Sequence, residues 1–408
     1  MARPWPPSCA TRLPYLTIRL TAQAAKSAER TIVILSALSA FSAGKRVPVV
    51  GTKGRLTVLP LLCYSPGMLP DSLDIEQPAA LLAYLRATGR IGPDETPRVQ
   101  SLQGGVSNRT VLVERPTGDA WVLKQALAKL RVAVDWFSSP ARIHREALGL
   151  RWLPRLAPPE TVPALVFEDE TQYLLAMQAV PQPHVNWKTL LLGGGLDPAH
   201  VVQFGALLAA IHRGAYERRA ELAPLFADRS FFESLRVEPY YSYAAGQVPA
   251  SAAFYASLIA ATRATSLTLV HGDYSPKNIL VHQGRLVLLD HEVIHWGDPA
   301  FDLGFSLTHL LSKAHHLPAH RAALADAARL YWRTYLDSLG PVPWRSDLEP
   351  RAVRHTLGCL LARVAGRSPL EYLSPAARDR QRAAVVALMA DPPPHVPELV
   401  AMFVARLA

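Results

Sequence analysis

The stretch HGDYSPKNILVHQGRLVLLDHE, residues 271–292, contains the residues that decide the fold. Its first part, HGDYSPKN, reads as a tight loop that carries Asp273 and Asn278, five positions apart. The rest reads as a hairpin of two apolar strands with its turn at residues 283–284, a Gln-Gly pair. Asp290 ends the second strand, twelve residues after Asn278. A hairpin brings the outer ends of its two strands together, so we expect Asp290 to lie beside Asn278.

These side chains have the chemistry that phosphoryl transfer needs. The reaction requires a carboxylate that orients the attacking hydroxyl and accepts its proton, and oxygen ligands for magnesium on the ATP phosphates. Asp273 fits the base, and Asn278 and Asp290 fit the metal ligands, with the Asp–Asn spacing of a kinase catalytic loop. Ordinary turn residues are the alternative, because Asp, Asn and Gly are common in turns. The segment GDPAFDLG, residues 297–304, follows in order and favours the catalytic interpretation.

The patterning changes from strands to helices near Pro181. Before it we expect strands at RVQSL, RTVLVER, AWVLKQ, TVPALVFE and QYLLAMQAV, and helices over residues 79–92 and 142–156. After it we expect helices over residues 198–218, 250–263, 300–311, 320–339 and 348–365, and two more at the C-terminus. The expected architecture is α+β, with a small antiparallel-sheet N-lobe over residues 68–180 and a mainly helical C-lobe over residues 181–408.

The motifs HGDYSPKNILV, LLDHE and GDPAFDLG together resemble those of the aminoglycoside phosphotransferase and choline kinase-type family. The similarity extends over residues 79–382. It implies a two-lobed fold like that of protein kinases, with ATP and Mg²⁺ in the cleft and the base and metal ligands named above. It also implies that Asp302 braces the catalytic loop. One departure is His291, where relatives often have Trp, and it raises a question about local packing or substrate contacts.

The N-lobe supplies the residues expected to bind the nucleotide. Lys124, in the strand WVLKQ, is expected to bind the α- and β-phosphates, and Glu146 to hold it in place, with Glu170 as the alternative partner. The loop QGGVSNRT occupies the place of the phosphate-covering loop, because its glycines let backbone N–H groups approach phosphate oxygens. The other expected cofactor-binding residues are Gly104, Gly105 and Ser107 in this loop, and Gln178 and Val180 at the hinge near the adenine.

The acceptor is expected to be a small molecule. Fewer than ten residues separate Asp290 from GDPAFD, which leaves no room for the long segment on which a protein kinase docks a peptide. Residues 181–408 carry 22 Lys and Arg against 19 Asp and Glu, a near-neutral balance that argues against a polycationic aminoglycoside. The stretch LKQALAKLR, residues 123–131, is similar to the corresponding strand of methylthioribose kinases, and Arg363 is the candidate substrate contact, with a solvent-facing arginine as the alternative.

We therefore expect an ATP- and Mg²⁺-dependent kinase that phosphorylates a hydroxyl of a sugar, an amino alcohol or a similar metabolite. A non-catalytic pseudokinase that binds nucleotide, and an aminoglycoside-modifying kinase, are the alternatives. Histidines are not expected to bind metal: His212 and the pair at residues 315–316 read as surface or satisfied buried residues. Glu292, two residues after Asp290, is expected to support the metal site from behind.

The composition limits the partners and the compartment. The formal charge is +10, but the basic residues form no runs, so neither nucleic acid nor a membrane is expected as a partner. Three cysteines without metal-ligand spacing fit a reducing cytoplasm. No apolar run approaches the roughly 18 residues needed to cross a bilayer. Residues 1–67 lack periodicity and read as a poorly ordered extension or a start codon assigned too far upstream, with a signal peptide as the alternative.

Overall fold

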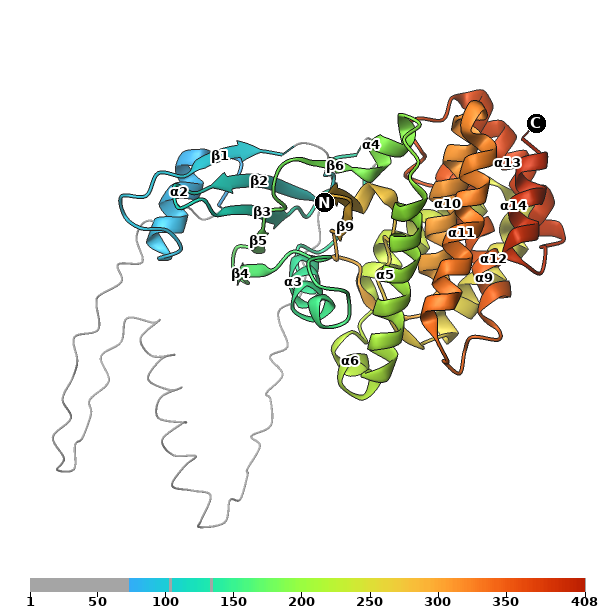
Figure 1. The fold of residues 1–408 in the computed structure, drawn as a ribbon, viewed down its shortest axis with the longest axis horizontal. Helices are drawn as coiled ribbons and strands as arrows, with labels where there is room; N and C mark the ends of the chain where they lie inside the picture. Colours follow the sequence, from blue (N-terminus) through green and yellow to red (C-terminus); the bar gives the residue numbers. More distant parts are fainter. Residues whose placement is uncertain (1–72, 103–104, 133–134, 408) are drawn as a thin grey trace, which may run out of the picture. The chain divides into compact units, whose positions relative to one another are not determined.

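The computed structural model describes residues 73–102, 105–132 and 135–407, which form a sheet-containing N-lobe and a helical C-lobe (Figure 1). The predicted extension over residues 1–67 lies outside the described residues. Among the described helices, none is long and apolar enough to pass through a membrane.

The N-lobe is one antiparallel sheet with a helix on each face. Its strands lie in the order β1-β2-β3-β5-β4. They are β1 (Arg98–Ser101), β2 (Asn108–Glu114), β3 (Ala120–Ala126), β4 (Leu165–Asp169) and β5 (Leu174–Gln178). The helices are α2 (Pro78–Ala87) and α3 (Arg142–Trp152), which continues as a short 3₁₀ turn, η1 (Leu153–Arg155).

Alternation along the strands divides the side chains between the two faces of this sheet. Trp121 and Leu123 of β3 pack with Leu81 and Leu85 of α2 in one buried cluster. Lys124, between positions of that face, points to the opposite side, which α3 covers. The period of two in the sequence therefore aims the lysine at the helix that carries Glu146.

The C-lobe is built on five long helices (Figure 1). These are α5 (Pro198–Glu217), α10 (Ala300–His316), α11 (Arg321–Leu339), α12 (Leu348–Ala365) and α13 (Pro375–Ala390). Among them, α10 packs against α11 and α12, α5 against α11, and α13 against α12. Shorter helices complete it: α4 (Trp187–Leu192), α6 (Arg219–Leu225), α7 (Ser230–Phe232), α8 (Tyr243–Gln247), α9 (Ala252–Ala264) and α14 (Val396–Ala405). A π-helical segment, η2 (Glu233–Ser242), and three 3₁₀ turns, η3 (Pro249–Ser251), η4 (Pro276–Asn278) and η5 (Pro318–His320), lie between them.

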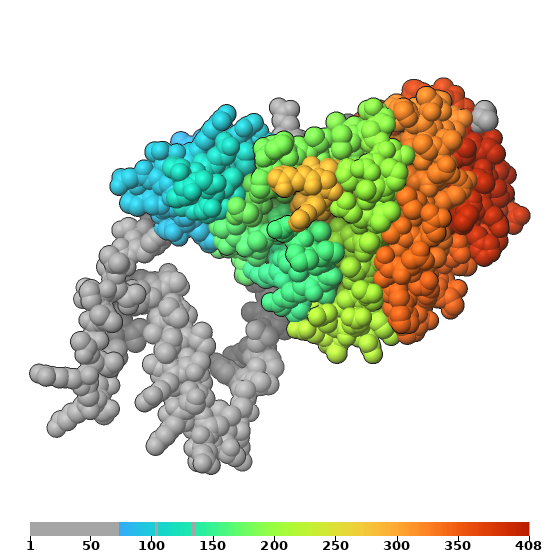
Figure 2. Space-filling model, in the orientation of Figure 1, coloured from blue at the N-terminus to red at the C-terminus, as the bar shows by residue number. Residues whose placement is uncertain are grey.

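Two small antiparallel sheets lie in the C-lobe. One contains the hairpin of residues 271–292, and the other pairs the strands that precede and follow this stretch. The first has the order β6-β8-β9, with β6 (His184–Asn186), β8 (Ile279–His282) and β9 (Arg285–Leu288). The other pairs β7 (Thr268–Val270) with β10 (His295–Gly297). The β8–β9 turn has positive φ at both central residues, 50° at Gln283 and 75° at Gly284, as a two-residue hairpin requires. Figure 2 shows part of this hairpin at the surface beside α5, whose Gln203 donates to the carbonyl of Gly284 at 2.8 Å.

The predicted fold class, an antiparallel-sheet N-lobe and a mainly helical C-lobe, is confirmed. All five expected N-lobe strands are present, and the helix expected over residues 348–365 has those bounds. The segments that the sequence did not predict are short or irregular, and they include α4, α6, α7, α8, the strands β6, β7 and β10, and the π-helical η2. Such segments hold few apolar repeats, so periodicity does not reveal them.

Candidate active site

Lys124 of the N-lobe forms ion pairs with both lobes. The ammonium of Lys124 donates to Oε1 of Glu146 at 2.6 Å and to Oδ1 of Asp290 at 2.9 Å. Glu146 lies on α3 and Asp290 follows β9. The predicted pairing of Lys124 with Glu146 is thus present in the structure, whereas Glu170, the alternative, is exposed at the turn between β4 and β5.

The loop that carries Asp273 is anchored from beneath by Asp302. The two carboxylate oxygens of Asp302 accept the backbone N–H groups of His271, at 2.7 Å, and Gly272, at 2.8 Å. Asp302 is fully buried in the first turn of α10, and His212 approaches it at 3.2 Å. Gly272 has φ of 78°, and a Cβ there would lie 3.0 Å from the carbonyl oxygen of Val293. The turn therefore needs glycine, and a buried carboxylate fixes its position.

The carboxylate of Asp273 is held on both sides. Nδ2 of Asn278 donates to its Oδ2 at 2.7 Å, and Nη2 of Arg236 lies 2.9 Å from its Oδ1. Arg236, on η2, also donates through Nε to the carbonyl of Gly272 at 2.7 Å. The contacts with Asn278 and Arg236 restrict the rotation of the Asp273 side chain.

The hairpin brings Asp290 next to Asn278, as the sequence predicts. Ile279 pairs with Leu288, and the N–H of Leu289 donates to the carbonyl of Asn278 at 2.9 Å. Asp290 follows directly and has φ of 69°, a left-handed conformation that Asp adopts more readily than most residues. Nδ2 of Asn278 donates to Asp273, and the role of its side-chain oxygen as a metal ligand stays a prediction.

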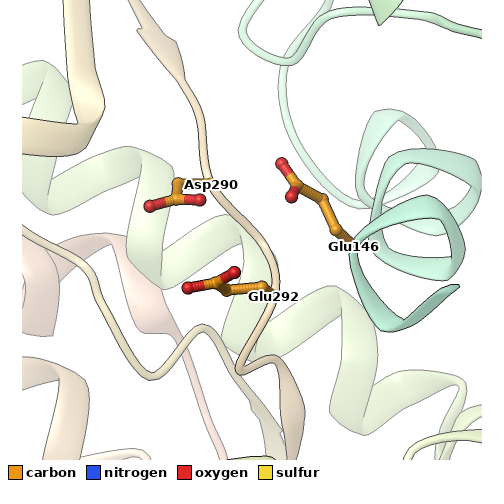
Figure 3. Close-up of side chains that lie close together, drawn as sticks. All are labelled: Glu146, Asp290 and Glu292. Atoms are coloured by element: carbon orange, nitrogen blue, oxygen red, sulfur yellow. The ribbon is translucent and has the colours of Figure 1, made fainter. Parts of the chain in front are cut away.

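Three carboxylates meet at the lobe boundary: Glu146, Asp290 and Glu292 (Figure 3). Each offers an oxygen, and the three oxygens lie within 4.8 Å of one another. Figure 3 shows Glu146 reaching from α3 toward the segment that carries the other two. The second oxygen of Glu146 is buried and has no hydrogen-bond partner among the described residues. An all-oxygen donor set with a vacant buried oxygen fits a hard divalent cation such as Mg²⁺.

The charges in this cluster are unequal. Burial lowers the pKa of Lys124, but Asp290 and Glu146 outweigh that effect and raise the pKa above its usual range. Burial raises the pKa of Asp290, but Lys124 and Lys277 outweigh it and bring that pKa below its usual range. For Glu146 burial wins over Lys124, and the pKa rises to about 7. Lys124 and Asp290 therefore form the charged pair, and Glu146 is the carboxylate nearest to protonation.

Glu292 is fixed by a buried arginine, Arg142, at the start of α3. Nε of Arg142 donates to Oε2 of Glu292 at 3.0 Å, and Nη2 donates to the carbonyls of Leu127, at 2.8 Å, and Ser107. The Arg142 side chain is completely buried. The guanidinium of Arg142 thus links α3, Ser107 and Leu127 of the N-lobe to Glu292 of the C-lobe. Glu292 was expected only behind the metal site, and the structure instead places its carboxylate within the oxygen cluster.

His291, the departure from the family pattern, packs against α3. Its Nδ1 lies 3.1 Å from Nε2 of His271, whose Nδ1 accepts the N–H of Asp273 at 3.2 Å. Burial, the neighbouring His271 and Lys124 hold the pKa of His291 well below its usual range. Within the described residues no histidine joins the oxygen cluster, and His212 bonds to Tyr335 at 2.9 Å and to Asp302.

A cavity beside this cluster brings together part of the predicted set. Its lining includes Ser107, Asp273, Asp290 and Arg363, so Arg363 is not solvent-facing and lies in the same cavity as the expected base. The lining does not include Gln178 or Val180, and their contact with adenine stays a prediction. Gly105 is exposed, and Gly104 lies outside the described residues.

Sequence reasoning missed two arginines of the site, Arg142 and Arg236. Both are buried. Arg142 contacts Glu292 and Arg236 contacts Asp273, each from an element that is distant in sequence. Arginine is common on helix surfaces, so nothing in the local pattern of either residue distinguishes it. Arg236 lies in a π-helical segment, for which the sequence offers no periodic signal.

Known proteins were compared by sequence and by structure. A methylthioribose kinase of Pectobacterium carotovorum is 25% identical over 293 residues, which cover 62% of this chain and 72% of that protein. Among solved structures, the macrolide 2′-phosphotransferase of Brachybacterium faecium is 18% identical with a TM-score of 0.43, covering 76% of this chain and 98% of that one. Choline kinase of Cryptosporidium parvum is 11% identical with a TM-score of 0.48, covering 80% of this chain and all of the other.

The sequence profile of one family matches residues 98–341, which is more than half of the chain. The match contains Lys124, the catalytic loop and Asp290. It confirms the predicted enzyme class, a kinase that transfers phosphate from ATP to a small molecule, and with it the use of ATP and a divalent cation. The chain belongs to the phosphotransferase enzyme family.

Proposed function

We propose that this kinase uses Mg²⁺ and ATP, and that Asp273 accepts the proton of the acceptor hydroxyl. The observation that carries the proposal is the double restraint on the Asp273 carboxylate, by Asn278 at 2.7 Å and Arg236 at 2.9 Å, at the wall of the cavity. A carboxylate aimed in this way lines up the hydroxyl oxygen for attack on the γ-phosphate.

The metal ligands in this proposal are Asn278 and Asp290, with Glu292 in the same oxygen cluster. These residues would hold Mg²⁺ against the ATP phosphates, where its charge would offset theirs. Lys124 would leave Asp290 and bind the α- and β-phosphates, while Glu146 keeps its position. Gly104, Gly105 and Ser107 are proposed to cover the phosphates, and Gln178 and Val180 to flank the adenine.

A non-catalytic pseudokinase, the alternative, is less consistent with this set of proposed catalytic residues. A module that only binds nucleotide has no need of a base such as the one proposed at Asp273, whose carboxylate lines the cavity. A sugar is the first acceptor class to test, since the relatives that are 25% identical are methylthioribose kinases. We also propose that the enzyme works in the reducing cytoplasm, where sparse free thiols such as the buried Cys359 persist.

The test is the substitution Asp273→Asn, assayed with an acceptor identified by screening ADP release over sugars, amino alcohols and aminoglycosides. Asparagine keeps the shape but accepts no proton, so kcat should fall by about 10²- to 10⁴-fold. The dissociation constant of ATP should change little, because Asp273 does not contact the nucleotide in this proposal.

The matched control is Asp326→Asn, the same change at an exposed position of α11, which should leave kcat unaltered. Full activity of the Asp273→Asn variant would remove Asp273 from the mechanism. Loss of ATP binding in that variant would mean that Asp273 shapes the nucleotide site instead.

A further inference from the structure

The end of the cavity beyond Asp273 is formed by Tyr240, Phe305, His309, Arg363 and Ser368, which we call the acceptor end. The rings of Tyr240 and Phe305 stack at 5.9 Å, and Phe305 meets His309 edge-on at 4.9 Å. The guanidinium of Arg236, which pairs with Asp273, lies over the rings of both Tyr240 and Phe305. The acceptor end therefore begins beside the proposed base, where the acceptor must bind.

Arg363 brings a positive charge to this end without a carboxylate partner. Nη1 donates to the hydroxyl of Tyr240 at 3.0 Å, to Oγ of Ser368 at 3.1 Å and to the carbonyl of Ser368, all of them neutral. Nε of Arg363 is buried and has no partner among the described residues. Only 9% of the residue is exposed. A buried charge is costly unless an opposite charge compensates it, so an anionic group of a ligand would be stabilised beside Arg363.

A second basic side chain, Lys313, lies one helical turn after His309. Lys313 of α10 is completely buried, and its ammonium donates to the carbonyl of His309 at 3.2 Å. Lys188 and Lys313 lie over the ring of Tyr372, at 6.0 and 5.6 Å from its centre. The one carboxylate that counters them is Glu371, which pairs with Lys188.

The carboxylates that line the cavity do not offset this excess. Within the described residues, Asp273 pairs with Arg236, Asp290 with Lys124, and Glu292 with Arg142. Lys277 lines the cavity as well. Nε2 of His309 is also buried and has no hydrogen-bond partner among the described residues. Arg363 therefore remains at the acceptor end as a charged side chain without a carboxylate partner among the described residues.

We propose that the acceptor carries a carboxylate or a phosphate ester, which binds Arg363 and His309 while its hydroxyl lies at Asp273. The inference rests on the proposed function and narrows its substrate class. A planar guanidinium with neutral partners suits either anion, because both oxyanions accept paired N–H donors. A polycationic acceptor would meet repulsion at the same place.

The first experiment measures ADP release by the full chain with matched acceptors. One arm compares glycerol with glycerate and with glycerol 3-phosphate, and another compares glucose with gluconate and with glucose 6-phosphate. Methylthioribose serves as a further neutral acceptor and choline as a cationic one. We expect kcat/KM for at least one anion, carboxylate or phosphate, to exceed that of its neutral partner by about 10- to 100-fold, the factor that one charged hydrogen bond supplies. Better use of methylthioribose, a neutral partner or choline would overturn this inference and leave the proposed function intact.

The second experiment uses Arg363→Gln with Arg367→Gln as its matched control. Arg367 lies on the same segment, pairs with Glu238 at 2.8 Å and does not line the cavity. We expect Arg363→Gln to raise KM for the anion by about 10- to 100-fold while KM for ATP stays the same, and Arg367→Gln to change neither. Equal losses for anionic and neutral acceptors would refute the anion contact. Arg363→Lys, which keeps the charge, should recover part of the affinity and covers the case of a poorly folded Gln variant.

A direct titration separates the two proposals. If no acceptor supports ADP release, the proposed function fails. Calorimetric binding of glycerate or glycerol 3-phosphate that is lost in Arg363→Gln would still support the anion site, and the absence of binding of both would reject it.

Discussion

Lys124 and Lys313 are both buried lysines, but their neighbours are opposite in charge. Lys124 lies between Glu146 and Asp290, which raise its pKa. Lys313 faces Lys188 and Arg363, with Glu371 alone acting against them. Burial, reinforced by the two cations, lowers the pKa of Lys313 to about 7. Lys124 therefore keeps its proton near neutral pH, whereas Lys313 is close to losing its proton.

This difference predicts a pH dependence of stability that Lys313 causes. The folded-state pKa is about 7 and the unfolded value is about 10.4, so between these pH values the unfolded chain binds more protons. The free energy of unfolding should therefore rise with pH across this window, since the buried charge disappears. Relative to Lys313→Met, the wild type should gain on the order of 4 kcal/mol between pH 6 and pH 10.

The measurement is chemical denaturation of both proteins over this pH range. Lys129→Met, at an exposed position of the N-lobe, is the control and should show the slope of the wild type. His309, Lys188, Arg363 and Glu371 stay the same in all three proteins, so only the part of their titration that depends on Lys313 enters the difference. Identical slopes for Lys313→Met and the wild type would contradict the assignment.

At the scale of elements, the position of α3 depends on one glycine. A Cβ on Gly149 would lie 2.8 Å from Cβ of His291 and 3.5 Å from Cγ2 of Ile294. Glu146 and Arg142 are on the same helix and contact the segment around Asp290. A residue larger than glycine would push this helix from the segment and disturb the carboxylate cluster.

We expect Gly149→Ala to destabilise the protein by about 1–3 kcal/mol, as overpacking does, and to raise KM for ATP. The control is Gly246→Ala in α8, where an added Cβ meets nothing within 4 Å and should be neutral or mildly stabilising. Denaturation curves and steady-state kinetics of both variants test this. Wild-type stability of Gly149→Ala would show that α3 can move away without cost.

Elements with a regular period were predictable from the sequence, and contacts between distant elements were not. The alternation in AWVLKQ indicates the strand and the face of Lys124, and the hairpin length brings Asn278 to Asp290. The inward direction of Arg142 and Arg236 depends on how α3 and η2 pack against the catalytic segment. Tertiary packing of this kind leaves no local trace, so a polar residue on a helix gives no sign that it is buried.

At the scale of the whole molecule, the described core begins at Leu73, and the family match begins at residue 98. We therefore predict that a chain starting at Met68 keeps the fold and the activity, with kcat/KM within about twofold of the full chain. The measurements are thermal unfolding and ADP release. A chain starting at residue 93 is the control, because it lacks α2, whose Leu81 and Leu85 cover the sheet, and should be markedly less stable. An insoluble or inactive chain from Met68 would contradict the domain boundary.

The guanidinium of Arg142 has a consequence for how sequences of this kind can diverge. It is completely buried, and Glu292 is the carboxylate that compensates it. A lineage that replaced Glu292 first would leave a buried cation without a counter-charge. One that replaced Arg142 first would leave an uncompensated carboxylate beside Asp290 and Glu146, which share Lys124. Either single replacement gives a less stable protein than the original pair or a complete exchange. The two positions are therefore expected to be inherited or exchanged as a pair. Natural variation in the carboxylate cluster is therefore constrained by a residue of the other lobe, 150 positions earlier in the chain.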